Sequence, residues 1–159
     1  MTFHELYEKY ASDVYRFSFW LCGSGMEADD LTAETFARAW AGREKIRTET
    51  VKAYLLAIAR NLYLEQQRKA KRFVELTPEQ SDPAPRPEKI VAQRLDLQTA
   101  QAVIQALPEI DRTVFLMRIE SGLSYAEIAR ATNLSLSAVK VKVHRVRLKL
   151  AEQQLSEDV

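Results

Sequence analysis

The chain has 159 residues, of which 47% are hydrophobic and 28% charged, and its net charge is +1. This composition is typical of a globular protein of one domain or two small ones, and it excludes a disordered chain. The lone Cys22 excludes an internal disulfide, and with only His4 and His144 the sequence predicts no metal centre and no cofactor. No apolar run approaches the roughly 18 residues that span a bilayer, and no signal peptide is visible. We therefore expect a cytoplasmic protein without membrane insertion of its own.

The small net charge is an average over segments of opposite sign. Residues 1–42 carry 3 Lys/Arg against 7 Asp/Glu, whereas residues 43–72 carry 9 against 3. Residues 136–159 carry 5 Lys/Arg against 3 Asp/Glu, and all five bases lie between Lys140 and Lys149. Two separate basic segments in a nearly neutral chain indicate two contacts with a polyanion such as nucleic acid.

The spacing of apolar residues is helical along the whole chain, and glycine or proline marks most of the breaks. Residues from Phe3 to Leu21 repeat at three and four, and Gly23 and Gly25 end that helix. Alternating, valine-rich segments typical of strands are absent, so the sequence predicts an all-α fold. The predicted helices are 3–22, 26–41, 51–71, 89–107, 109–121, a short one ending at Thr132, and a last one beginning near Ser135 or Leu136.

Residues 73–88 contain four prolines, Pro78, Pro83, Pro85 and Pro87. Proline lacks an amide donor and clashes with the preceding helical turn, so we expect this stretch to be a semi-extended linker and not a helix. It divides the chain into two small helical domains, residues 1–72 and 89–159. The alternative, a loop packed within one domain, stays open.

A helix-turn-helix pattern follows in the second half. Ser124 and Glu127 have the spacing of a capping box, in which each side chain bonds the other residue's amide. Asn133 can adopt the left-handed conformation that a tight turn needs. Small Ala129 lets two helices approach, and Val139 fills the angle between them. The sequence therefore predicts a DNA-binding motif of this type.

The last predicted helix has an apolar side and a basic side. Its buried stripe is predicted to be Val139, Val143, Val146 and Leu150, and no acid appears before Glu152. Such a helix fits the major groove of about 12 Å and can present bases to phosphates and guanine edges. A solvated polar face is the alternative, which the helix-turn-helix spacing disfavours. The side chains outside the stripe are Lys140, Lys142, His144, Arg145, Arg147 and Lys149.

The second predicted helix carries an acidic ridge, Glu27, Asp30 and Glu34, with Leu31 and Phe36 beside it. Paired carboxylates can serve acid–base chemistry or a metal, but no histidine, nucleophile or further ligand cluster accompanies them. The sequence also lacks a phosphate-binding glycine loop. We therefore expect no catalytic residues and no enzyme, and the ridge is either a solvated face or a partner-binding surface.

Three segments in the right order resemble sigma-70-type transcription initiation factors. The stretch from Asp30 to Trp40 is similar to their core-polymerase-binding segment, and Tyr54 to Leu62, continuing to Arg68, is similar to their −10 segment. Leu107 to Leu116 with the following helix-turn-helix resembles their −35-binding domain. The short length matches the extracytoplasmic-function (ECF) group, which keeps regions two and four joined by a linker. The chain departs from the usual pattern at Tyr54, Glu65, Thr32-Ala33, Ser137-Ala138 and Val141.

The resemblance implies partners and roles for named residues. The implied partners are the clamp of core RNA polymerase, promoter DNA and an anti-sigma factor. Residues for the polymerase are Glu27, Asp30, Leu31, Glu34 and Phe36. Residues for melted −10 DNA are Arg43, Ile46, Arg60, Asn61, Arg68 and Lys69, with the loop 43–50 receiving an unstacked base. Residues for the −35 element are Ser135, Ser137, Lys140, Val141, Lys142, His144, Arg145 and Arg147.

A second reading of the sequence remains open. The chain can also be a helix-turn-helix transcriptional regulator, in which residues 1–72 form a sensor or dimerisation domain. The basic run at 43–72 distinguishes the two, because a sensor domain has no need of it. Specific transcription with core polymerase and promoter DNA is the experiment that separates them.

Overall fold

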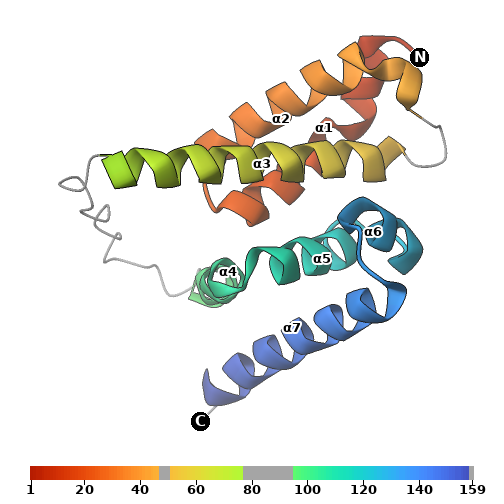
Figure 1. Ribbon diagram of the computed structural model, residues 1–159. Helices are drawn as coiled ribbons and strands as arrows, with labels where there is room; N and C mark the ends of the chain where they lie inside the picture. The colour runs from red at the N-terminus through yellow and green to blue at the C-terminus, as the bar shows by residue number, and fades with distance from the viewer. Residues whose placement is uncertain (47–50, 77–94, 158–159) are drawn as a thin grey trace.

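The computed structural model describes residues 1–46, 51–76 and 95–157, and these residues are helical with no strand among them (Figure 1). The elements are α1 (Phe3–Cys22), α2 (Gly25–Ala41), a short 3-10 helix η1 (Arg43–Lys45), α3 (Val51–Leu76), α4 (Leu95–Ala106), α5 (Glu109–Ile119), α6 (Tyr125–Thr132) and α7 (Leu136–Glu157). The all-α prediction is confirmed.

Local signals explain the helix ends in the first half. Thr2 and Glu5 form a capping box before α1, and Gly23 ends it in the left-handed conformation with φ 78°. The hydroxyl of Ser24 then accepts from the amide of Glu27 at the start of α2. Helices α1, α2 and α3 pack around a core of large apolar side chains that are fully buried, among them Val14, Phe17, Leu31, Phe36 and Leu55.

Helices α5, α6 and α7 build the predicted helix-turn-helix. Ser124 and Glu127 form the capping box of α6, and Asn133 ends that helix with φ 59° and ψ 37°. Asparagine tolerates this left-handed conformation better than most residues, which explains the tight turn without a glycine. Val139 is fully buried where α7 meets α6 and α5.

The third helix corrects one prediction. α3 continues to Leu76, so residues 73–76, which the sequence assigned to the linker, are helical. The physical reason is the position of the first proline. Pro78 would clash with the preceding turn only in a helix that included it, and it disfavours helical geometry at the residue before it, so a helix can continue as far as Leu76. The rest of the predicted linker, residues 77–88, and the start of the helix predicted at 89–107 lie outside the described residues.

The two halves of the chain pack against each other. α1 contacts α4 and α5, α3 contacts α6, and buried side chains from both halves belong to one hydrophobic cluster (Figure 1). Polar bonds reinforce this packing at its edges. Gln105 donates to the carbonyl of Trp20 at 2.8 Å, and Lys52 donates to the carbonyl of Ser121 at 3.0 Å.

Arg112 of α5 ties the halves together at the centre of this interface. Its side chain is buried, and the guanidinium donates to the carbonyl of Leu21 at 2.8 Å and the hydroxyl of Tyr63 at 2.9 Å, both in the first half. The remaining N–H groups donate to carbonyls of the second half, at Ile104, Gln105 and Leu107. A guanidinium has five donors, so every one is satisfied despite burial.

The sequence predicted neither a membrane span nor a metal centre. Among the described residues, no helix is long and apolar enough to cross a membrane. Within the same stretches of chain, no group of three or more His, Cys, Asp or Glu residues could hold a metal ion.

Candidate nucleic-acid and partner-binding surfaces

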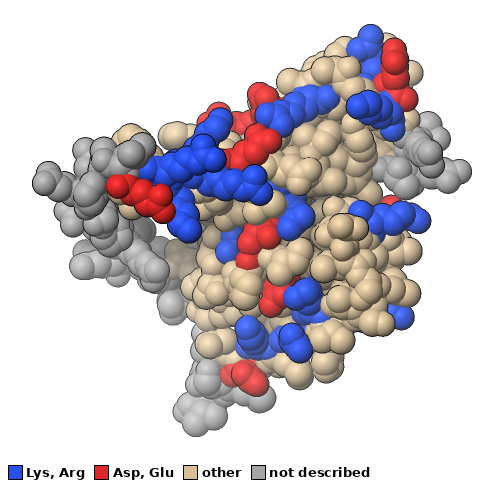
Figure 2. Space-filling model, in the orientation of Figure 1, with Lys and Arg blue, Asp and Glu red and all other residues tan. Residues whose placement is uncertain are grey.

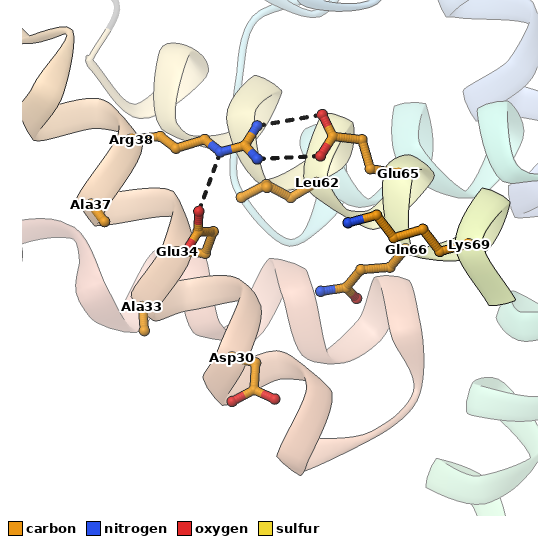
Figure 3. A pocket seen from close by; sticks show the side chains of 9 residues that line it. All are labelled: Asp30, Ala33, Glu34, Ala37, Arg38, Leu62, Glu65, Gln66 and Lys69. Atoms are coloured by element: carbon orange, nitrogen blue, oxygen red, sulfur yellow. Dashed lines mark hydrogen bonds and ion pairs between the residues drawn. The ribbon is translucent and has the colours of Figure 1, made fainter.

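Two residues of the acidic ridge of α2, Asp30 and Glu34, lie along one wall of an open groove between α2 and α3. The groove has a volume of about 640 Å³ and contains Asp30 and Glu34 on one side and Glu65 and Lys69 on the other (Figure 3). Arg38 bridges the two walls, donating to Glu34 at 3.4 Å and to Glu65 at 3.3 and 3.4 Å. Arg38 therefore holds the carboxylate of Glu34 in place, while Glu34 and Asp30 remain exposed to a partner.

Two residues assigned to the polymerase surface lie elsewhere. Leu31 and Phe36 are both 0% exposed, because they point from α2 into the core with α1 and α3. They cannot touch a partner and instead fix the position of the helix. The groove also contains Lys69, which the sequence assigned to −10 DNA. Lys69 thus faces Asp30 and Glu34 across the same groove, although the sequence assigned them to two different surfaces.

Basic side chains gather over the C-terminal end of α3, as Figure 2 shows. Arg68, Lys71 and Arg72 are exposed there, and Asn61 is exposed two turns earlier on the same helix. The three bases in the last turns of one helix make a concentrated positive potential. This surface can hold the phosphates of a nucleic-acid strand.

Arg60 differs from these exposed bases because an acid of the other half already binds it. Its guanidinium forms two hydrogen bonds to the carboxylate of Glu109, at 2.7 and 3.1 Å, and its side chain is only 16% exposed. Burial raises the pKa of Glu109, but the hydrogen bonds from Arg60 and Thr113 outweigh burial and hold the pKa below its ordinary value of 4.5. In this arrangement Arg60 is not available to DNA.

A small pocket lies beside the predicted base-binding loop. Its volume is about 190 Å³, and Leu6, Trp40, Arg43, Ile46 and Val51 are among the residues that line it. The guanidinium of Arg43 lies over the Trp40 ring, 4.6 Å from its centre, and donates to the Trp40 carbonyl at 3.0 Å. The pocket therefore combines an apolar wall with a cation, while residues 47–50 of the loop lie outside the described part of the chain.

The outward face of α7 is basic, but two of its lysines contact the protein's own residues. Lys142 donates to Asp111 at 2.9 Å and is only 21% exposed, and Lys140 lies over the ring of Tyr125 at 5.8 Å. His144, Arg145 and Arg147 are exposed. The Ser135 hydroxyl accepts from the amide of Ala138 and so caps the helix, which leaves its own proton for a phosphate.

Three charged residues of α5 have contacts that the sequence did not predict. Glu109, Asp111 and Arg112 contact Arg60, Lys142 and Tyr63, respectively. Acidic residues in the first turn of a helix interact favourably with the helix dipole, which explains Glu109 and Asp111 without any distant partner. Nothing in the local pattern indicates partners that are 49 or 31 residues away in the chain.

The fold and these surfaces define a helical protein with a DNA-binding helix-turn-helix in its second half, and comparison with known proteins agrees. The sigma-70 region 2 family matches residues 6–73, and the sigma-70 region 4 family matches residues 97–150. The first match covers the segment that the alternative interpretation assigned to a sensor or dimerisation domain.

Similar proteins extend the match over nearly the whole chain. The ECF RNA polymerase sigma factor SigE of Mycolicibacterium smegmatis is 35% identical over 95% of this chain, which spans 61% of that protein. SigL of Mycobacterium tuberculosis, also an ECF sigma factor, is 32% identical over 94% of this chain and 88% of its own length. The chain belongs to the ECF RNA polymerase sigma factors, as the sequence resemblance predicted.

A solved structure has the same arrangement of both halves. It contains the sigma factor RpoE of Bartonella quintana in complex with the anti-sigma factor NepR. Its sigma chain is 25% identical to this one, with a TM-score of 0.81 over 94% of each chain. The likeness therefore includes the placement of α1–α3 relative to α4–α7.

Proposed function

We propose that this chain brings core RNA polymerase to promoters, with separate surfaces for the polymerase, the −10 strand and the −35 duplex. The observation that carries the proposal is the separation of charge. Exposed carboxylates line the α2 side of the groove, whereas exposed bases gather at the end of α3 and on the outward face of α7. The phosphates of DNA repel carboxylates and attract lysine and arginine side chains, so the two kinds of surface suit different partners.

The acidic ridge is the proposed contact with the polymerase clamp. Glu27, Asp30 and Glu34 are exposed on α2, and Arg38 limits the freedom of Glu34. Leu31 and Phe36 support the ridge from within the core. The groove further suggests that Lys69 acts with this surface, because it lies on the opposite wall.

The −10 strand is assigned to the exposed bases of α3 and to the pocket beside η1. Arg68 supplies phosphate contacts, and Asn61 supplies an amide that can bond a base edge. An unstacked base fits the pocket, since its aromatic wall and the Arg43 cation suit a π-face. Extruding that base costs a few kcal/mol, which these contacts must recover.

The −35 duplex is assigned to α7, whose N-terminal half enters the major groove in this motif. We further propose that residues 1–72 and 89–159 act as separate domains when DNA is bound, and that an anti-sigma factor keeps them together. The solved complex of a similar sigma factor with an anti-sigma factor supports that partner. These activities place the protein in the cytoplasm, where polymerase and promoters are found.

Transcription in a purified system tests the proposal. Core RNA polymerase, this chain and a library of DNA fragments are incubated together, and transcripts are mapped to their start sites. We expect specific starts only when the chain is present, downstream of a shared pair of sequence elements. If the chain binds DNA alone and core polymerase never starts at those sites, the regulator interpretation is correct and the sigma-factor role is not.

A further inference from the structure

The outward face of α7 has an apolar residue at its centre. Val141 is 47% exposed, although it lies in the helix that is otherwise basic on this side. On a helix, residues three and four positions away share its face, so Ser137, His144 and Arg145 surround it. All three are exposed. Val141 therefore occupies the middle of the surface that a DNA groove would cover.

The two residues next to Val141 turn to the flanks of this face. Lys140 lies over the Tyr125 ring on α6, and Lys142 is bound to Asp111 on α5. Both long cationic side chains therefore lie away from the centre of the face, which leaves the valine uncovered. The centre of the face is thus a small apolar surface, with Lys140 and the Lys142–Asp111 pair at its flanks and the exposed Arg145 beside it.

We propose that Val141 recognises the 5-methyl group of a thymine in the −35 element, and so selects an A·T pair of one orientation at that position. The inference rests on the proposed promoter-binding function. In the major groove the thymine methyl is the apolar group by which the base edges differ, and short apolar side chains contact it. The exposed cations near it, Arg145 and Arg147, can hold the phosphates and so bring the valine to the base edges. A valine offers no hydrogen bond to guanine, cytosine or adenine.

Two other exposed apolar residues of α7 are less suitable for this role. Leu148 is 51% exposed but lies two turns further along the helix, where a recognition helix leaves the groove floor. Leu136 is 45% exposed and is the first residue of the helix, on a different side from Val141. Position and direction therefore single out Val141.

Replacing thymine by uracil removes only the methyl group, so it tests the contact directly. A −35 element selected from random DNA is made with uracil at one thymine at a time, on either strand, and affinity of the polymerase–sigma complex is measured. For the wild-type protein we expect one position at which the substitution weakens binding about fourfold, the effect of losing one buried methyl group.

Variants of the protein, each combined with the uracil substitutions, test whether residue 141 makes the contact. In Val141→Ser the uracil effect at that position should vanish, whereas Val141→Thr, which keeps a methyl group, should retain part of it. Arg145→Ala weakens binding overall but should leave the uracil effect intact. Because Val141 is exposed, each variant should keep the wild-type melting temperature, which circular dichroism verifies.

The outcomes separate this inference from the function on which it rests. If −35-dependent binding exists but no uracil substitution has an effect that depends on residue 141, Val141 does not recognise thymine and the sigma-factor role stands. A selected −35 element without thymine leads to the same conclusion. If core polymerase and this chain show no −35-dependent binding, the proposed function fails, and this inference fails with it.

Discussion

The guanidinium of Arg60 and the carboxylate of Glu109 meet at 2.7 and 3.1 Å and join α3 to the first turn of α5. Thr113 adds a third hydrogen bond to the same carboxylate, at 2.7 Å. The pair connects the half with the predicted −10 surface to the half with the helix-turn-helix. A phosphate bound by Arg60 must displace Glu109, so binding of the −10 strand and this packing of the halves compete for one side chain.

This pair predicts a pH dependence of stability. Although burial alone raises the pKa of Glu109, the bonds from Arg60 and Thr113 hold it below 4.5. A pKa that is lower in the folded state than in the unfolded state stabilises the fold above the unfolded value, and this contribution is lost as the pH falls through the folded value. We expect Glu109→Gln to be less stable by about 1–3 kcal/mol at neutral pH, with a smaller further loss below pH 4.5 than in wild type.

Denaturant titrations of both proteins at several pH values measure this difference. Glu120→Gln is a matched control, because Glu120 forms an ion pair with Arg16 between the same two halves but on a more exposed site. Its effect should be below about 1 kcal/mol. Parallel acid profiles for wild type and Glu109→Gln would show that the pair does not contribute.

Arg112→Met should be the most destabilising single change at the interface between the halves. Methionine has similar length but leaves the carbonyl of Leu21 and the hydroxyl of Tyr63, among other groups, without their donor. Leaving buried acceptors unpaired costs about 1–3 kcal/mol for each, so we expect a loss of about 3 kcal/mol or more. The free energy of unfolding from urea titration is the measurement.

Arg118→Met is the matched control for Arg112→Met. Arg118 is also on α5, lies 4.3 Å from the centre of the Tyr125 ring and donates to the carbonyl of Leu123, all within the second half. We expect a loss near 1 kcal/mol. Equal losses for the two variants would mean that the bonds across the interface carry no special weight.

The acidic ridge predicts a defect in polymerase binding without a defect in folding. Asp30→Arg with Glu34→Arg reverses the charge of the groove wall, and we expect binding to core polymerase to fall at least a hundredfold, because a partner surface complementary to carboxylates would then face like charges. Fluorescence competition with labelled wild-type protein gives the affinity. Unchanged affinity in the folded double variant would remove the ridge from the polymerase contact.

Its control has the same change of charge elsewhere. Glu8→Arg with Glu152→Arg alters exposed acids of α1 and α7 that do not line the groove. We expect this variant to bind core polymerase within about threefold of wild type, because only screened, distant charge has changed.

The position of Arg147 on α7 predicts that this residue contributes to the salt dependence of DNA binding. It is exposed on α7, three turns from the helix start, where side chains contact phosphates more than base edges. Arg147→Ala should weaken all −35 sequences alike and reduce the slope of log affinity against log salt by about one. Lys9→Ala on α1 should leave the slope unchanged. A sequence-dependent loss in Arg147→Ala would instead make this residue a base reader.

Much of the fold and the function was predictable from local patterns in the sequence. The ends of α1, α2 and α6 follow from residues such as Gly23, Ser24 and Asn133, whose backbone preferences and side-chain caps act within a few positions. The helix-turn-helix and the order of the segments were likewise sufficient to identify the family. These features are encoded by neighbouring residues, so the sequence determined them by itself.

The availability of the functional side chains was decided only by the tertiary structure. Arg60 and Lys142 look like free cations in the sequence, but Glu109 and Asp111 of α5 bind them. Leu31 and Phe36 look like parts of a contact surface, but they are fully buried. Whether a charge is paired or a side chain is covered depends on how distant helices are placed against each other, and local periodicity contains no information on that placement.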